Sequence, residues 1–230
     1  MSLRRAVLYT LAAIVAVCVI WLAWVAGHVA WWRTHSPSET AFMSQRMDEL
    51  HARNARATFH YRWVPYARIS DHLKRAMIAA EDSRFVEHEG FDWAGIELAI
   101  EKNQRRGRVV AGGSTITQQL AKNLFLSSAR SYWRKGAEAI ITVMLETMLA
   151  KERIFELYLN VIEWGNGVFG AEAAAQRYFG IPAAQLNAEQ AARLAAMAPN
   201  PRFYERNPNA PGLNRKIRII LSRMRGSDLP

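Results

Sequence analysis

The first thirty residues of the chain contain one unbroken apolar stretch. No Asp, Glu, Lys or Arg occurs between Arg5 and Arg33. Coiled as a helix, residues 6–27 would be roughly 33 Å long, which is about the thickness of the hydrocarbon core of a bilayer. The pattern therefore predicts a transmembrane anchor, to which we assign residues 6–30.

Two other interpretations of this stretch are open, a cleaved signal peptide and a buried core helix. The apolar region of a signal peptide is only about 7 to 15 residues long, and a core helix of a soluble protein rarely stays apolar on every face. An uncleaved anchor fits the length better. Arg4 and Arg5 precede the stretch and tryptophans lie near its far end, which predicts a cytoplasmic N-terminus over residues 1–5 and a body outside the cytoplasm.

Beyond the anchor the pattern changes twice. Residues 31–60 are polar and weakly patterned, and they predict a juxtamembrane linker. From Tyr61 onward, apolar residues recur at helical spacing in segments such as "SDHLKRAMIAAED", where Ser70 is the expected N-cap, and "NAEQAARLAAM". No alternating run indicates a substantial sheet. The pattern predicts one compact, mainly α domain over residues 61–230.

The net charge and the single cysteine limit the classes of ligand and site that this domain can have. The formal net charge is +10, and Arg4 and Arg5 are the only charged residues before Arg33, so the body is strongly basic. Such a surface suits anionic lipid head groups or phosphates, whereas nucleic acid fits poorly outside the cytoplasm and no nucleic-acid motif is recognised. The single cysteine, Cys18, excludes an intramolecular disulfide and a cysteine metal site. The basic residues in "LNRKIRIILSRM" could touch a membrane, although a solvated helix face is the commoner arrangement.

The stretch "GGSTITQQLAKN" has the composition of an anion-binding helix start. Thr115 and Gln118 have the spacing of a capping box, and two glycines precede them. Free backbone amides at the start of a helix, followed one turn later by Lys122, would bind an anion such as phosphate. An ordinary capped helix with a solvated face explains the same pattern.

A pair of carboxylates ends the preceding apolar helix. Glu81 and Asp82 lie where the helix dipole disfavours negative charge and raises the proton affinity of a carboxylate. A carboxylate of this kind makes a better general base. The alternative is that Glu81 forms an ordinary surface ion pair with Arg84 or His88.

A cluster of charges follows at helical spacing. Arg130, Arg134 and Glu138 recur every four residues, with Lys135 beside them. The arrangement could be a simple stabilising ion pair on one helix face. Combined with Glu81 and the anion-binding stretch, it indicates a different chemistry, in which cations bind a phosphate leaving group while a carboxylate activates a hydroxyl.

Five segments, taken in order, resemble the motif set of the bacterial peptidoglycan glycosyltransferases. They are "EDSRFVEHEGFDW", "GGSTITQQLAKNLFLS", "RSYWRKGAEA", "KERIFELYLNVIEWGNGVFGAEAAAQRYFG" and "AARLAAMAPNPRFY". The resemblance extends from about Tyr61 to Met224, and five linked motifs are far more specific than one. Larger members of the family carry a transpeptidase domain, whose SxxK, SxN and KTG set is not found here. We therefore expect a monofunctional member without transpeptidase activity.

The resemblance implies a lysozyme-like, helical glycosyltransferase domain that polymerises lipid II. Glu81 would remove the proton from the 4-hydroxyl of the acceptor's N-acetylglucosamine, which attacks C1 of the lipid-linked growing glycan chain. Inversion would give a β-1,4 bond and release undecaprenyl pyrophosphate. The domain would lie on the periplasmic side of the bacterial inner membrane, with "FDWAGIELAI" and the basic loop after Asn103 touching membrane lipids.

The resemblance also implies roles for individual residues. Glu138 would be the second catalytic carboxylate, which assists at the pyrophosphate directly or through a divalent cation, Mg or Mn; the bond chemistry itself needs no cofactor. The substrate-binding residues would be Lys122, Arg130, Arg134 and Lys135 near the phosphates and Ser114, Thr115, Gln118 and Gln119 along the cleft wall. The residues that support Glu81 would be Asp82, Phe85 and His88, and the scaffold turn would contain Asn160, Gly165, Gly167 and Gly170.

Two functions compete with polymerisation. A membrane-anchored lytic enzyme that cuts glycan strands would need a protonated carboxyl as its general acid, but the lysine and arginine cluster would then have no leaving phosphate to bind. A non-catalytic scaffold for cell-wall assembly would use the basic surface to hold lipids or cell-wall synthesis and division proteins. In that case both glutamates would be dispensable.

Overall fold

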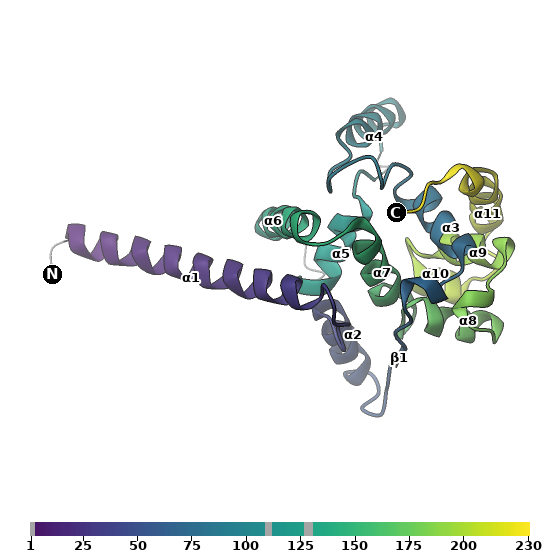
Figure 1. Cartoon of the computed structure of the whole chain (residues 1–230), viewed down its shortest axis with the longest axis horizontal. Coiled ribbons are helices and arrows are strands. Elements are labelled where there is room, and N and C mark those ends of the chain that lie inside the picture. The colour runs from purple at the N-terminus through teal and green to yellow at the C-terminus, as the bar shows by residue number, and fades with distance from the viewer. Residues whose placement is uncertain (1–2, 109–111, 127–130) are drawn as a thin grey trace.

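The computed structural model describes residues 3–108, 112–126 and 131–230. Helix α1, Leu3–Trp31, extends away from the rest of the protein as a single rod (Figure 1). By length and composition it is the one described helix that could cross a membrane. Most of its side chains are exposed, and only its last turns contact the body, through residues such as Val25 and Val29. The predicted N-terminal apolar helix is therefore present.

The segment expected to be a plain linker contains a second helix. Helix α2, Ala41–His51, begins at Thr40, whose hydroxyl accepts a hydrogen bond from the backbone N–H of Met43 at 3.2 Å. Met43 and Arg46 are buried, because α2 lies against the body. The sequence did not predict this helix, because its buried face combines Met43 with Arg46 and so shows no apolar periodicity.

Further helices make up most of the body, and the apolar periodicity predicted the majority of them. They are α3 Asp71–Glu81, α4 Trp93–Arg106, α5 Ile116–Phe125, α6 Tyr132–Met148, α7 Lys151–Val161, α8 Ala171–Phe179, α9 Ala188–Met197, α10 Pro201–Arg206 and α11 Pro211–Arg223, with the short turns η1 Tyr66–Arg68, η2 Ala183–Gln185 and η3 Met224–Gly226. The expected cap of α3 is confirmed, because the Ser70 hydroxyl accepts a hydrogen bond from the N–H of His72.

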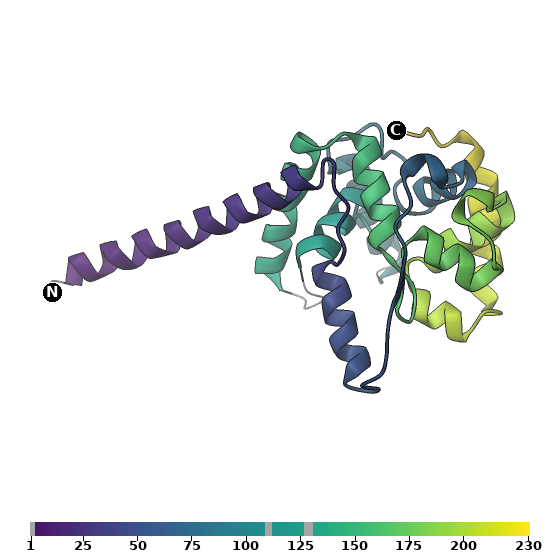
Figure 2. The same ribbon diagram turned by 60° about the horizontal axis from the view of Figure 1, so that its bottom comes forward.

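The core joins two groups of helices. Helix α3 packs against α9, which also packs against α11, while α5 packs against α6 and α7 (Figure 2). The largest fully buried side chains include Trp164, Tyr158, Phe85 and Phe155. The rings of Phe85 and Phe155 lie 5.4 Å apart between centroids, so the loop after α3 is packed onto α7. This packing fixes the end of α3 relative to α5 and α7.

A small sheet completes the body, although the sequence showed no alternating pattern. Strands β1 His60–Tyr61, β2 Glu163–Gly165 and β3 Val168–Phe169 form the order β1-β3-β2, with β1 parallel and β2 antiparallel to β3. Two or three residues are too few to show a period. Gly170 has φ of 84°, and a Cβ there would come within 2.6 Å of the Asn160 carbonyl oxygen. The Asn160 side chain binds both backbone groups of Val64.

Candidate active site

Glu81 is the last residue of α3 and is partly buried beside α5. Its Oε2 accepts a hydrogen bond from Gln119 Nε2 at 2.7 Å. Burial raises the pKa of Glu81, and the hydrogen bond from Gln119 and the charges of Lys216 and Lys122 oppose that rise. The ion pair with Arg84 or His88 is not formed, since Arg84 pairs with Asp92 instead. Glu81 is thus a carboxylate with raised proton affinity, as a general base requires.

A buried tyrosine fixes the orientation of Gln119. The hydroxyl of Tyr158, on α7, donates a hydrogen bond to Gln119 Oε1 at 3.1 Å. Burial holds the pKa of Tyr158 well above its usual value, and the charge of Glu81 adds to this effect. The phenol therefore stays protonated and donates, so the amide NH₂ group points toward Glu81.

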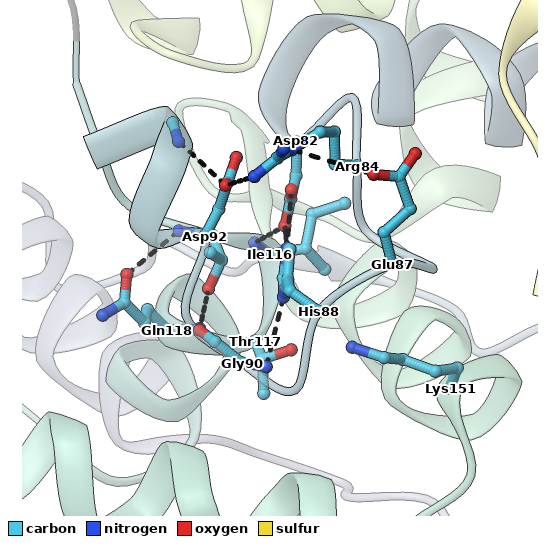
Figure 3. Close-up of polar contacts among 12 residues, drawn as sticks. Asp82, Arg84, Glu87, His88, Gly90, Asp92, Ile116, Thr117, Gln118 and Lys151 are labelled. Carbon is cyan, nitrogen blue, oxygen red and sulfur yellow. Dashed lines mark hydrogen bonds and ion pairs between the residues drawn. The ribbon is translucent and has the colours of Figure 1, made fainter. Parts of the chain in front are cut away.

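The loop after α3 is tied to the start of α5 by Asp82 (Figure 3). Asp82 Oδ1 lies 2.9 Å from His88 Nε2, and Oδ2 accepts a hydrogen bond from the N–H of Ile116 at 3.0 Å. The N–H of Gly90 donates to His88 Nδ1 at 3.2 Å, which places the imidazole proton on Nε2. Asp82 and His88 are thus hydrogen-bonded to each other next to Glu81 in the chain, and Phe85 is buried in the same loop. Their support of Glu81 stays a prediction.

Two residues expected to line the cleft form the cap of α5 instead. The hydroxyl of Thr115 accepts from the N–H of Gln118, and Gln118 Oε1 accepts from the N–H of Thr115. The Thr115 hydroxyl also donates to the carbonyl of Gly90 at 2.7 Å. Both side chains are buried, so the predicted capping box is confirmed while a direct contact with substrate is not favoured. Ser114 is exposed just before this cap.

A cavity of about 220 Å³ opens beside Gln119. Its lining combines amides, a phenol, charged groups and apolar residues: Phe42, Gln119, Lys122, Asn123, Tyr158, Ile162, Glu163, Ala198, Pro199, Asn200, Pro201 and Arg202. Burial lowers the pKa of Lys122, whereas the charges of Glu138 and Glu81 raise it. Lys122 is therefore within electrostatic reach of both glutamates, on the wall of the same cavity.

The second glutamate lies on α6 between two cations. Glu138 is buried, and its Oε2 accepts a hydrogen bond from an Arg134 terminal nitrogen at 2.9 Å. Lys135 Nζ binds the other carboxylate oxygen. Arg134 Nε is buried without a hydrogen-bond partner among the described side and main chains. Arg130, expected in the same cluster, lies outside the described residues.

The described residues do not form a metal site by themselves. No group of three or more His, Cys, Asp or Glu side chains within the described ranges could hold a metal ion. Both oxygens of Glu138 are already bonded to cations. The donor set near Glu138 therefore does not fit a divalent cation without oxygens from a ligand.

Sequence reasoning missed two residues near Glu81. Tyr158 lies on the apolar face of α7, where helical periodicity indicated only a core residue. Lys216 belongs to the basic face of α11, which the pattern predicted to be solvated, yet its charge acts on the pKa of Glu81. Neither residue has a local signal, because each reaches the site through the packing of separate helices.

The chain is similar to one protein family model and to several proteins of the same description. A family model described as Transglycosylase matches residues 47–225. A protein of Chromobacterium violaceum described as a biosynthetic peptidoglycan transglycosylase is 58% identical over 99% of this chain and 100% of its own length. Proteins of the same description from Dechloromonas aromatica and Methylobacillus flagellatus are 60% and 59% identical, over 96% and 92% of this chain and 95% and 93% of their own lengths.

Proposed function

Because this chain belongs to the transglycosylase family, we propose that it polymerises lipid II into glycan strands by a mechanism in which Glu81 is the base. It is a peptidoglycan glycosyltransferase with a mainly helical, lysozyme-like domain. The 4-hydroxyl of the acceptor lipid II attacks C1 of the lipid-linked glycan chain. A β-1,4 bond forms with inversion, and undecaprenyl pyrophosphate leaves with the electron pair of the broken C1–O bond.

The position of Glu81 supports its role as the general base. The hydroxyl proton passes to the carboxylate, whose raised pKa makes it a better acceptor than an ordinary surface glutamate. Gln119 holds Oε2, and this leaves Oε1 to take the proton. One observation carries the proposal: Glu81 adjoins, through Gln119, a cavity whose wall also bears Lys122.

Positive charge near Glu138 supports departure of the pyrophosphate. A phosphate leaving group gains negative charge in the transition state, and fixed cations stabilise that charge without a proton transfer. Lys122, Arg134 and Lys135 supply such cations, and Glu138 holds the last two in place. We assign no step to a metal ion.

The anchor supports a location at the bacterial inner membrane with the domain on the periplasmic side. Helix α1 is long and apolar enough for a single-pass anchor. Helix α4 exposes large apolar side chains, and 72% of Trp93 is accessible. Together with Leu98 and Ile100 this surface suits contact with membrane lipids. A lipid-linked substrate would then reach the cavity from the bilayer.

The lytic alternative is weaker because of the charges around the two glutamates. Cleavage between two sugars releases a sugar hydroxyl, which calls for a proton donor rather than for cations. The cations Arg134 and Lys135 beside the buried Glu138 favour an anionic leaving group instead. The scaffold alternative gives no role to the raised pKa of Glu81.

Purified protein incubated with labelled lipid II in detergent tests the proposal. We expect a polymer that lysozyme digests, with undecaprenyl pyrophosphate released in proportion to the bonds formed. A well-folded protein that forms no polymer but releases fragments from finished peptidoglycan would support the lytic function. A protein that does neither would support the scaffold.

A further inference from the structure

The cavity beside Gln119 contains a third carboxylate that the proposed mechanism does not use. Glu163, on β2, lines this cavity, and only 6% of its side chain is exposed. Its Oε1 accepts hydrogen bonds from Nε and one terminal nitrogen of Arg46, each at 3.3 Å. Its Oε2 lies 3.8 Å from Nε of Arg202. Glu163 therefore bridges two arginines that are far apart in the sequence.

Arg46 forms the inner end of this bridge. It belongs to α2, before residue 47 where the family match begins, and only 3% of its side chain is exposed. A buried guanidinium is costly unless it is paired, and Arg46 is paired with Glu49 as well as with Glu163. Burial raises the pKa of Glu163, and the charges of Arg46 and Arg202 oppose that rise. Arg46 thus helps keep Glu163 ionised inside the protein.

Arg202 forms the outer end and differs from Arg46 in its exposure. Its side chain is 45% exposed on the cavity wall that also contains Lys122. Glu163 is its one ion-pair partner within the described parts of the chain, and the approach is through Nε. The two terminal nitrogens of the guanidinium are therefore available for a bidentate contact with an oxyanion.

We propose that Arg202 binds an oxyanion of the glycan-lipid substrate in this cavity, and that Arg46 sets the position of Arg202 through Glu163. The inference deepens the proposed function and depends on it. The oxyanion is either a carboxylate of the peptide stem or a phosphate of the pyrophosphate, because arginine recognises both groups with the same geometry. Arg202 is then a substrate-binding residue, and Arg46 is a positioning residue.

This arrangement makes α2 a part of the active site. Phe42, one turn before Arg46, lines the same cavity. The helix that connects the membrane anchor to the body thus contributes an apolar wall and, through Glu163, controls a cation. A role limited to pinning α2 onto the body would also use the Arg46–Glu163 pair, but it would not involve Arg202 in substrate binding.

Steady-state kinetics of the full chain in detergent distinguish these roles. We expect Arg202→Gln to raise KM for lipid II by roughly tenfold with little change in kcat. The variant loses a hydrogen bond between Arg202 and the substrate oxyanion that forms on binding and does not change during the chemical step. Arg218→Gln is the matched control, because it removes the same charge from an exposed arginine on α11, away from this cavity. Equal KM values for the two variants would overturn the proposal.

A double variant tests the coupling. If Arg46 acts through Arg202, then Arg46→Gln raises KM, and Arg46→Gln combined with Arg202→Gln raises it no further than Arg202→Gln alone. Independent, multiplying effects would overturn the positioning role. Melting temperatures show whether Arg46→Gln is folded. If it is not, the comparison of Arg202→Gln with Arg218→Gln still tests whether Arg202 binds the substrate. Wild-type protein that forms no polymer would instead reject the proposed function.

The substrate decides which oxyanion is bound. With lipid II whose peptide carboxylates are amidated, the KM effect of Arg202→Gln disappears if the contact is with the stem and persists if the contact is with a phosphate. Either result supports an oxyanion in the cavity. No difference between Arg202→Gln and wild type on either substrate contradicts it.

Discussion

Gln119 joins the proposed base at the end of α3 to helix α5, since its Nε2 donates to Glu81 Oε2 at 2.7 Å. The same amide accepts a hydrogen bond from Tyr158, which fixes its orientation. Three helices, α3, α5 and α7, therefore meet in one chain of hydrogen bonds. The chain controls both the position and the proton affinity of the carboxylate.

Removal of this hydrogen bond is expected to change the pH dependence of the reaction. The bond stabilises the charged form of Glu81, so Gln119→Leu raises the pKa of Glu81 further above its usual value of 4.5. A base with a higher pKa needs a higher pH to lose its proton. The acidic limb of the kcat/KM profile therefore moves to higher pH, as measured by initial rates of polymerisation.

The control for this experiment is Gln185→Leu, which changes an exposed glutamine on η2. Its acidic limb should coincide with that of the wild type. If Gln119→Leu also leaves the limb in place while the protein stays folded, the hydrogen bond does not govern the titration of Glu81.

Burial of Glu81 should also be visible in the stability of the protein. Because the folded state raises the pKa, the carboxyl holds its proton in the folded chain at pH values where the unfolded chain has lost it. Its contribution to stability therefore falls as the pH rises from about 4.5 through the folded pKa. Glu81→Gln removes this loss and should therefore raise Tm at pH 7.

The pH dependence of that difference is its test. Below pH 4.5 both side chains are neutral, so the two proteins should melt together in differential scanning calorimetry. A Tm advantage of the glutamine variant that is equal at pH 4 and pH 7 would show that ionisation of Glu81 is not its cause.

The helices of the body could be predicted because their apolar faces repeat at the helical period. Helices α3 and α9 both show this pattern, and Ser70 caps α3 as expected. Helix α2 did not, since its buried face contains Arg46, whose partner Glu163 lies 117 residues away. The three short strands were also missed, because pairing between distant segments leaves no local pattern.

The predicted site is partly local and partly assembled by packing. Glu81 and Asp82 end α3, and Arg134 and Glu138 form the i,i+4 pair that their spacing on α6 indicates. The catalytic roles of these residues stay predictions. The family resemblance implied that Gln118 lines the cleft, but its side chain is used in the capping box of α5. Tyr158 could not be found in this way, since its hydroxyl reaches Gln119 only through the contact of α7 with α5.

The hydrogen bonds of Asp82 are expected to contribute to the stability of the folded protein. Asp82→Ala removes a buried carboxylate that binds His88 and the N–H of Ile116. Both partners then lack their acceptor, so the free energy of unfolding should fall by about 3 kcal/mol. Urea titration measures this change. Asp48→Ala, at an exposed position on α2, should stay within about 0.5 kcal/mol of the wild type; equal losses would contradict the assigned role.

The cations near Glu138 are expected to act on the chemical step. Arg134→Gln removes a guanidinium that binds Glu138 and carries a buried donor without a partner. If this group stabilises the departing pyrophosphate, kcat falls roughly a hundredfold, while Arg218→Gln leaves kcat unchanged. The single-turnover rate at which undecaprenyl pyrophosphate is released measures this change in kcat. A change in KM alone would show that Arg134 binds the substrate and would contradict its role in the chemical step.

The most direct test of the account compares two glutamates in the same segment. Glu81→Gln and Glu87→Gln make the same chemical change, but Glu87 is exposed and pairs only loosely with Arg84, at 3.9 Å. The measurement is the rate at which each folded variant converts labelled lipid II into lysozyme-sensitive polymer. We predict that Glu81→Gln loses activity by at least about a hundredfold and that Glu87→Gln keeps the wild-type rate. Polymerisation by Glu81→Gln at the wild-type rate would contradict its assignment as the base.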